Sequence, residues 1–231
     1  MNIVLFNPNT TESMTARMHG AAAPMVGRGT SLIPLTAAKG MPSIEGYYDE
    51  VFVVPPMIEA LTPMAGEIDG VVVGCFDDTG VDALRAFLDV PVVGICQAAM
   101  YAASMISTGF SVVTTLRRSV AIIEDLAIRY GMERNCRRVR AAEIPVLALE
   151  EEGGEAREKI KAEILRALED DGCEVVILGC AGMADLMAWL TEETGVPVID
   201  GVAAGVKIVE ALVGAGITTS KIGAYAPPRP K

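Results

Sequence analysis

Two apolar runs that each end in Gly-Cys most constrain what this chain can fold into. The first runs through residues 70–74 to Cys75, and the second runs through residues 175–179 to Cys180, 105 positions later. An apolar run without polar alternation is typical of a strand buried on both faces of a parallel sheet. Ligands of open α/β sheets bind just outside the carboxyl ends of such strands, where both cysteines are predicted to lie. One buried cysteine alone is most often a core residue, so the matched pair carries the argument.

The offset between the two cysteines recurs at other landmarks. Pro91 in Val-Pro-Val-Val-Gly corresponds to Pro197 in Val-Pro-Val-Ile-Asp at an offset of 106, and segment 3–6 corresponds to segment 111–114 at an offset of 108. Strand-like and helix-like segments alternate through both halves, which indicates parallel sheets with right-handed crossovers. The sequence therefore predicts an α/β protein with two similar, flavodoxin-like parallel-sheet domains related by pseudo-two-fold symmetry.

The domain boundaries follow from this repeat. We predict that residues 1–97 with 208–231 form the first domain, to which the chain returns in its last helix, and that residues 98–207 form the second. The active site is expected in the cleft between the domains. Cys75 and Cys180 would then approach this cleft from opposite sides.

The periodicity of apolar residues gives an approximate set of elements. Strands are predicted at residues 2–6, 30–35, 69–74, 90–95, 110–115, 139–147, 175–178 and 196–200, and helices at residues 49–64, 80–89, 97–107, 118–129 and 151–170, with further helices starting near 12, passing through 189 and ending near 213. Pro55 and Pro56 are expected to kink or interrupt the helix at 49–64. The Gly/Pro-rich segment 38–48 is predicted to be a binding loop or a plain surface connection, and the tail 226–231 to be extended and mobile.

Composition excludes several classes of function. The net charge of −11 argues against a nucleic-acid surface, which needs clustered cations. The five cysteines are odd in number without metal-type spacing, and His19 is the only histidine, so we predict neither a disulfide framework nor a metal site. No apolar stretch is as long as a membrane span, and the N-terminus lacks the features of a signal peptide, so we expect a cytoplasmic protein without membrane contacts.

Polar residues at the ends of the predicted strands are candidates for substrate binding. Asn9 and Thr10 follow the first strand, and Thr114 and Thr115 end its counterpart in the second half. Thr79 follows the first Gly-Cys strand. We expect these side chains to line the cleft and their hydroxyl groups to hydrogen-bond the polar edge of a small-molecule substrate, although helix capping alone would also explain Thr115.

Two thiols facing one cleft suit the inversion of a carbon stereocentre. One thiolate would remove a proton while the opposite thiol delivers a proton to the other face. A free thiol ionises near pH ~8.5, and a helix N-terminus after each cysteine is expected to favour the thiolate. Backbone N–H groups after each cysteine could hold the charge that develops on a carbonyl oxygen. No lysine suited to pyridoxal chemistry follows a strand, so we predict no cofactor.

Several short motifs together resemble a known family. They are Asn7-Pro8-Asn9-Thr10-Thr11, Ser43-Ile44-Glu45, Gly74-Cys75-Phe76 with Asp78 and Gly80, residues 90–95, and Leu178-Gly179-Cys180-Ala181-Gly182-Met183. The chain resembles the aspartate/glutamate racemase superfamily over nearly its whole length, and within it the hydantoin/allantoin racemase branch. This resemblance implies a two-domain α/β fold, cofactor-independent racemisation with Cys75 and Cys180 as catalytic residues, and homo-oligomers. It adds to the predicted substrate-binding residues Ser43, Ile44, Phe76, Asp78, Gly80, Ala181 and Gly182.

One loop departs from the pattern of this branch. The branch usually has a loop like Gly-Cys-Phe-Gly-Asp-Pro-Gly, whereas this chain has Asp77 and Thr79 at the fourth and sixth positions. An extra carboxylate beside Cys75 is expected to oppose thiolate formation and to repel anions, which favours a neutral ring imide over an amino dicarboxylate. Arg117 and Arg118 could reverse this local balance.

The leading hypothesis is therefore a racemase or epimerase of 5-substituted hydantoins, allantoin or a similar compound. Other activities of the same superfamily remain as alternatives: an aspartate/glutamate-type amino-acid racemase, a decarboxylase or a cis–trans isomerase. A non-catalytic, two-lobed small-molecule binding protein is an alternative from a different class. It would have inert cysteines and would exchange no solvent deuterium into a ligand.

Overall fold

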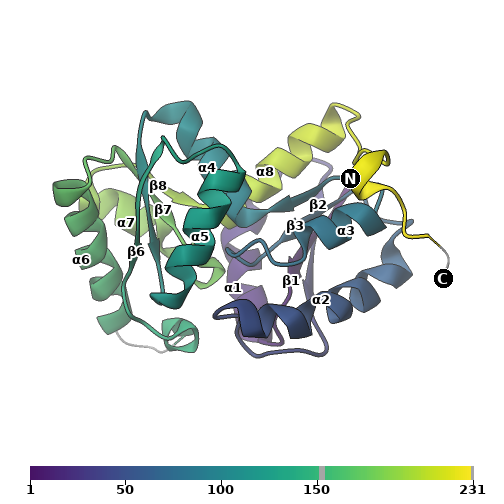
Figure 1. Cartoon of the computed structure of the whole chain (residues 1–231), viewed down its shortest axis with the longest axis horizontal. Helices are drawn as coiled ribbons and strands as arrows, with labels where there is room; N and C mark the ends of the chain where they lie inside the picture. Colours follow the sequence, from purple (N-terminus) through teal and green to yellow (C-terminus); the bar gives the residue numbers. More distant parts are fainter. Residues whose placement is uncertain (151–153, 230–231) are drawn as a thin grey trace.

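Two four-stranded parallel sheets form the framework of the molecule. The computed structural model describes residues 1–150 and 154–229. The strand orders are β2-β1-β3-β4 and β6-β5-β7-β8, so both sheets have the same topology. The sheets lie side by side with helices packed on their faces (Figure 1). The predicted α/β fold with two flavodoxin-like domains is confirmed.

The elements follow one another in the expected alternation. The strands are β1 (Asn2–Asn7), β2 (Ser31–Thr36), β3 (Gly70–Val73), β4 (Val92–Gly94), β5 (Phe110–Thr114), β6 (Cys136–Ala141), β7 (Val175–Leu178) and β8 (Val198–Asp200). The α-helices are α1 (Glu12–Ala22), α2 (Tyr47–Leu61), α3 (Val81–Phe87), α4 (Ile95–Ile106), α5 (Arg118–Arg129), α6 (Glu155–Asp170), α7 (Met187–Thr194) and α8 (Gly201–Gly214). Short 3₁₀ helices are η1 (Ala23–Met25), η2 (Thr62–Met64), η3 (Val146–Glu150), η4 (Ala181–Leu186) and η5 (Gly223–Tyr225).

The strands β3 and β7 occupy equivalent places in the two sheets. Every residue of both strands is buried, as expected for apolar strands covered on both faces. β3 pairs with β1 from Ile3 opposite Gly70, and β7 pairs with β5 from Phe110 opposite Val175. Because each cysteine comes two residues after its strand, the repeat in the sequence becomes a repeat in space.

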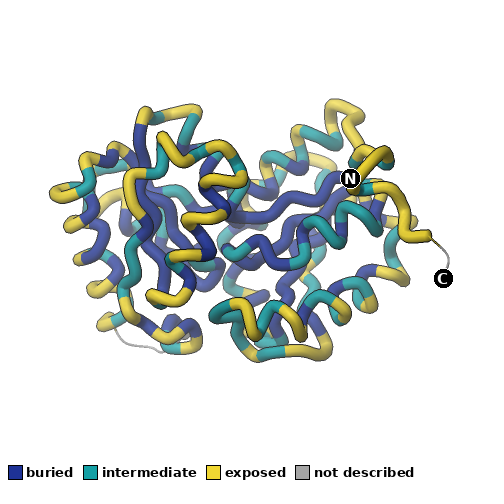
Figure 2. The backbone as a smooth tube through the Cα atoms, in the orientation of Figure 1, coloured by how far each residue is buried: buried dark blue, intermediate teal, exposed yellow. Residues whose placement is uncertain are grey.

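The largest core cluster spans both halves of the chain. α8 packs against α4 and against β3, between the two sheets (Figure 1). Glycine allows the close approach: a Cβ at Gly201 would lie 2.5 Å from the Ile95 carbonyl oxygen, and one at Gly205 would lie 2.9 Å from Val72. Figure 2 shows the central strands of both sheets, β1, β3, β5 and β7, as buried and the outer helix faces as exposed. The division into 1–97 with 208–231 and 98–207 stays a prediction.

Some elements differ from their predicted form. α2 runs continuously through Pro55 and Pro56, so these prolines do not interrupt the helix, and the predicted alternative, a kink, stays a prediction. The strand predicted at 139–147 is β6, which ends at Ala141, because Glu143 has a φ of 54° and Pro145 follows it. α6 begins at Glu155, and the predicted start at 151 lies outside the described residues.

The last segment of the chain packs back onto the first half. The Tyr225 hydroxyl donates a 2.8 Å hydrogen bond to Asp82 in α3. Residues 226–229 form neither helix nor strand, as expected for an extended tail, whereas 230–231 lie outside the described part of the chain. None of the described helices combines the length and the apolar character that crossing a bilayer requires.

Candidate active site

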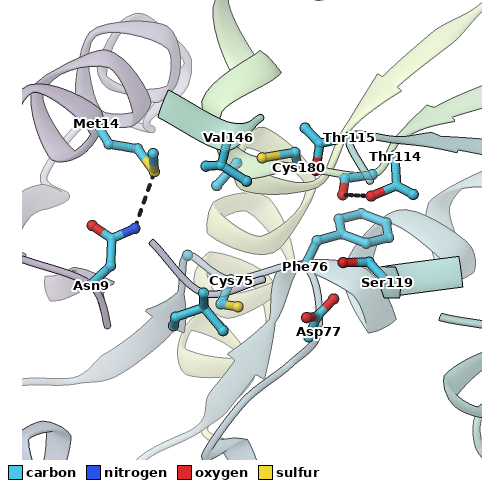
Figure 3. Close-up of a pocket in the computed structure, with 14 residues that line it drawn as sticks. Asn9, Met14, Cys75, Phe76, Asp77, Thr114, Thr115, Ser119, Val146 and Cys180 are labelled. Carbon is cyan, nitrogen blue, oxygen red and sulfur yellow. Dashed lines mark hydrogen bonds between the residues drawn. The ribbon is translucent and has the colours of Figure 1, made fainter. Parts of the chain in front are cut away.

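A small cavity lies where the carboxyl ends of β3 and β7 face each other. Its volume is about 30 Å³, enough for about two water molecules. Cys75 and Cys180 approach it from opposite sides (Figure 3). The lining residues are Asn9, Met14, Ile44, Gly74, Cys75, Phe76, Asp77, Thr114, Thr115, Ser119, Val146, Gly179, Cys180 and Ala181. Both halves of the chain therefore contribute walls to one site.

Cys75 is held by the glycine before it and by the turn after it. A Cβ at Gly74 would lie 2.7 Å from the Met18 sulfur, so the backbone at this position packs directly against α1. The Thr79 hydroxyl lies 3.6 Å from the Cys75 sulfur. Burial, and secondly the charge of Asp77, raise the pKa of Cys75 well above that of a free thiol.

Cys180 has a matching environment at the end of β7. A Cβ at Gly179 would lie 2.8 Å from the Cβ of Thr114, and the Thr114 hydroxyl donates a 2.9 Å hydrogen bond to the Gly179 carbonyl. Cys180 is the N-cap residue of η4. Burial raises the pKa of Cys180 to about 12, although a hydrogen bond from the Gly182 backbone N–H opposes this rise.

The expectation that a helix start after each cysteine favours the thiolate needs correction. Cys180 directly precedes η4, but residues 76–80 separate Cys75 from the first residue of α3. In both cases desolvation outweighs the stabilising hydrogen bonds, because burial penalises the charged form of the thiol. The thiols of this cavity are therefore protonated at neutral pH.

The predicted residue Asn9 lines the cavity, but its amide is already engaged. Its oxygen accepts hydrogen bonds from the Asn7 amide at 2.8 Å and from the Thr11 backbone N–H at 2.9 Å, and its nitrogen lies 3.2 Å from the Met14 sulfur (Figure 3). Thr10 lies outside the lining and donates its N–H to the Met41 carbonyl at 3.0 Å. The turn after β1 therefore holds the loop 37–46 beside the cavity.

Asp78 also lies outside the cavity lining. Its carboxylate accepts the backbone N–H groups of Cys96 and Gln97, both at 3.0 Å, and the Tyr130 hydroxyl at 2.7 Å. Burial raises the pKa of Asp78 to about 6 in spite of these bonds. The contacts tie the turn after Cys75 to the start of α4 and to the end of α5.

The structure thus brings part of the predicted set to one cavity. Among the predicted residues, those in the lining are Asn9, Ile44, Cys75, Phe76, Thr114, Thr115, Cys180 and Ala181, and those outside it are Thr10, Ser43, Asp78, Thr79, Gly80 and Gly182. Thr79 and Gly182 still contact the two thiols, as described above. The Ser43 hydroxyl donates to the Glu45 carboxylate at 3.2 Å.

Met14, Ser119 and Val146 line the cavity without having been predicted. Met14 and Ser119 lie in the first turns of α1 and α5, the helices that follow the central strands β1 and β5. Met14 and Ser119 occupy equivalent positions in the two halves of the sequence repeat, and this equivalence could have predicted both residues. Val146 begins η3 within a segment that had been predicted as strand.

The charges around the cavity are predominantly negative. Asp77 lines it, and burial together with the charges of Glu50 and Asp78 raises the pKa of Asp77 to about 7. Arg117 and Arg118 do not line the cavity, and Arg117 is exposed and forms a 3.4 Å ion pair with Glu143. The described residues contain no group of three or more His, Cys, Asp or Glu side chains placed to hold a metal ion.

Comparison with known proteins identifies the family of this chain. The family model for Asp/Glu/Hydantoin racemase matches residues 3–209. A hydantoin racemase of Rhizobium meliloti is 50% identical over 232 residues, with 100% of this chain and 96% of that protein covered.

Solved structures agree with this match. An allantoin racemase from Klebsiella pneumoniae superposes with a TM-score of 0.97 at 42% identity, covering 100% of this chain and 95% of that one. An allantoin racemase from Pseudomonas fluorescens superposes with a TM-score of 0.96 at 39% identity, covering 100% and 98%. The chain belongs to the Asp/Glu/Hydantoin racemase family and is an isomerase of the racemase type.

Proposed function

We propose that the protein is a cofactor-independent racemase of a 5-substituted hydantoin or of allantoin, with Cys75 and Cys180 as opposed acid and base. The observation that carries this proposal is the equivalent placement of the two thiols, each two residues after a central strand and on opposite sides of one cavity. The names of the similar proteins, hydantoin racemase and allantoin racemase, support the substrate class.

The proposed reaction is one proton removal followed by one proton delivery. A thiolate takes the proton from the ring carbon that bears the substituent, and the electron pair of the broken C–H bond moves toward the adjacent carbonyl oxygen as an enolate. The opposite thiol then gives its proton to the other face of that carbon. The enzyme ends with thiol and thiolate exchanged, so it is ready for the mirror-image reaction.

Hydrogen-bond donors around the cavity would stabilise the enolate oxygen. The hydroxyl groups of Thr115 and Ser119 line the cavity, whereas the Thr114 hydroxyl is already used by the Gly179 carbonyl. A preorganised donor in a water-poor site stabilises developing charge more than the same donor in water. We therefore assign Thr115 and Ser119, rather than Thr114, to the polar edge of the substrate.

The high pKa of the thiols has a cost and a benefit. With a pKa of about 12, on the order of one Cys180 side chain in ten thousand is ionised at pH 8. A thiolate with a high pKa is also a strong base once it forms, which suits proton removal from carbon. Substrate binding must therefore supply part of the stabilisation of the thiolate.

An amino dicarboxylate is a poorer substrate for this cavity. Asp77 contributes a carboxyl group to the lining, and the lining includes neither lysine nor arginine among the described residues. Two carboxylates brought into such a site would remain unpaired, and unpaired buried charge is strongly unfavourable. The neutral ring imide is therefore the favoured substrate.

Exchange of solvent deuterium into each separate enantiomer tests the proposal. Cys75→Ser is expected to abolish net racemisation while Cys180 still exchanges the enantiomer that it faces, and Cys180→Ser should show the mirror behaviour. A serine hydroxyl is far too weak a base to replace a thiolate at neutral pH. Cys136→Ser serves as the control, because Cys136 lies in β6, outside the cavity lining. Full racemase activity in either active-site variant would contradict the two-thiol mechanism.

A further inference from the structure

A second cavity, of about 310 Å³, lies between α2 and α5 beside the turn that follows Cys75. We call it the acidic cavity and define it by Glu50 of α2, Asp77 of the turn and Asp125 of α5, with Val81, Ile122 and Leu126 as its apolar wall. Asp77 lines both this cavity and the one between the thiols. The two spaces therefore share Asp77 as a wall residue.

The negative charge of the acidic cavity is not balanced. Asp82 and Arg129 also border it, but they form an ion pair with each other. Asp78 borders it too and is bonded to Tyr130 and to the start of α4. Among the ion pairs of the described residues, none involves the three acidic residues that define the cavity. The hydroxyl-bearing side chains of Tyr47 and Thr79 also line the cavity, and the Tyr47 hydroxyl is bonded to Asp125.

Two carboxylate oxygens in this region lack any hydrogen-bond donor. Oε1 of Glu50 and Oδ2 of Asp77 are shielded from solvent and have no hydrogen-bond partner within the described structure. A buried acceptor without a donor costs on the order of 1–3 kcal/mol, and more when it is charged. Burial raises the pKa of both carboxyl groups, and the charge of Glu50 raises that of Asp77 further. A positive charge on a ligand in the cavity would stabilise the ionised form of both carboxyl groups.

The acidic cavity lies within reach of the reacting carbon of the proposed substrate. Thr79 lines the acidic cavity, and its hydroxyl lies 3.6 Å from the Cys75 sulfur. The cavity between the thiols has a volume of only about 30 Å³, the space of about two water molecules, so it has no room for a substituent beside the reacting carbon. A substituent on the carbon that Cys75 deprotonates therefore needs a second space, and the acidic cavity adjoins the site on the Cys75 side.

We propose that the acidic cavity is the subsite for the 5-substituent of the substrate, and that it selects an aliphatic chain ending in a positively charged ammonium or guanidinium group. The aliphatic stem lies against Val81, Ile122 and Leu126, and the charged end forms ion pairs with the carboxyl groups of Glu50 and Asp77. This inference rests on the proposed hydantoin racemase function and names the substrate class within it. The protein then racemises hydantoins of basic side chains in preference to neutral or acidic ones.

Racemisation of three matched substrates tests the preference. The probes are hydantoins with a 4-aminobutyl, a pentyl and a 2-carboxyethyl substituent, which are cationic, neutral and anionic. The cationic probe is expected to exceed the neutral probe in kcat/KM by about tenfold, and the anionic probe to be the slowest, because unlike charges attract across a poorly solvated wall. Asp77→Asn and Glu50→Gln, which keep the shape of the side chain, should each reduce the cationic preference to about twofold or less.

Glu59→Gln is the matched control. Glu59 is an acidic residue of the same helix, α2, but it is exposed and pairs with Lys39 at 3.0 Å. Its substitution should leave the order of the three probes unchanged. If the parent protein and both cavity variants treat the three probes alike, the assignment of the subsite is wrong even though hydantoin racemisation stands.

Thiol labelling tests the same inference without turnover. Methanethiosulfonates with a trimethylammonium or a sulfonate group react with a thiolate to form a mixed disulfide and release methanesulfinate. Cys75 is expected to react faster with the cationic reagent, by about tenfold beyond the ratio for a free thiol in solution, and Asp77→Asn should abolish this bias. If the parent protein racemises none of the hydantoins but Cys75 still reacts faster with the cationic reagent, the proposed function is wrong and the acidic subsite stands. An absent bias at Cys75 would overturn the subsite.

Discussion

The Thr79 hydroxyl lies 3.6 Å from the Cys75 sulfur and is the side-chain group that stabilises the thiolate of this cysteine. A hydroxyl donor favours the charged form of a thiol, and it opposes the effects of burial and of Asp77. Each thiol also receives a backbone hydrogen bond, from Asp77 at Cys75 and from Gly182 at Cys180. The two thiols therefore depend on different donors for the same task.

Replacement of Thr79 should weaken catalysis with little effect on folding. Thr79→Val removes the donor to Cys75, and kcat/KM is expected to fall by about tenfold, equivalent to about 1.4 kcal/mol of lost transition-state stabilisation. Thr79→Ser keeps the hydroxyl and should retain most of the activity. Steady-state kinetics of both variants provide the measurement, and an unchanged rate in Thr79→Val would show that the hydroxyl does not assist the thiolate.

Thr114 should behave differently because its hydroxyl is buried and bonded to the Gly179 carbonyl at 2.9 Å. Thr114→Val leaves this carbonyl without its donor, and we expect the free energy of unfolding to fall by about 1–3 kcal/mol. Thr114→Ser keeps the donor and serves as the control. Urea denaturation of the two variants measures the difference. Equal stability would mean that the Gly179 carbonyl finds another donor.

The pH dependence of racemisation should reflect the high pKa of the thiols. Burial raises the pKa of Cys75, and that of Cys180 to about 12, so the base is scarce at neutral pH and becomes more abundant as pH rises. We expect kcat/KM to increase from pH 7 to beyond pH 9, and to fall only where the opposite thiol also loses its proton. Asp77→Asn removes a negative charge beside Cys75 and should shift the rising limb to lower pH. A kcat/KM that stays constant from pH 7 to pH 9 would show that the pKa of the catalytic base is not raised.

The glycine before Cys180 should tolerate no side chain. A Cβ at Gly179 would lie 2.8 Å from the Cβ and 2.9 Å from the Cα of Thr114, and the backbone atom cannot move away cheaply. Gly179→Ala is expected to cost about 1–3 kcal/mol of stability and to displace Cys180. Gly20→Ala in α1 is the control, because a Cβ there meets no atom within 4 Å. Thermal unfolding of both variants compares the two positions.

Asp200 should make stability depend on pH. It caps α8 by accepting the backbone N–H groups of Val202 and Ala203, and burial raises the pKa of Asp200 to about 6. Because the folded state holds this proton more tightly, the stabilisation is complete below about pH 4 and is lost as pH rises through 6, on the order of 2–3 kcal/mol.

Asp200→Asn keeps the acceptor without the charge and should remove this part of the pH dependence. Asp200→Ala loses the cap and should cost about 1–2 kcal/mol above pH 6. Denaturant unfolding at pH 4 and pH 7 separates the two effects. Equal pH profiles for the parent protein and Asp200→Asn would mean that this carboxyl group does not bind its proton more tightly in the folded state.

The sequence was sufficient for the fold because its strongest signal, the apolar runs before Cys75 and Cys180, reports buried parallel strands directly. The sequence was insufficient where the direction of a side chain decides whether the residue lines the cavity. The sequence places Asp77 and Asp78 side by side, yet Asp77 lines the cavity while Asp78 turns away to Tyr130, since φ of 48° at Asp78 reverses the chain. Burial of the thiols also lies beyond sequence patterns, so the sequence predicted the effect of Asp77 on the pKa of Cys75 but not the larger effect of desolvation on both thiols.

The unequal surroundings of Cys75 and Cys180 lead to a constraint that thermodynamics imposes on the proposed racemisation. Mirror-image substrates have the same free energy in water, so their interconversion has an equilibrium constant of one, and kcat/KM must be identical in the two directions. Asp77 and Thr79 beside one thiol, and the η4 backbone beside the other, can therefore change only how this common value divides between kcat and KM. The enantiomer with the lower KM must also have the lower kcat, by the same factor.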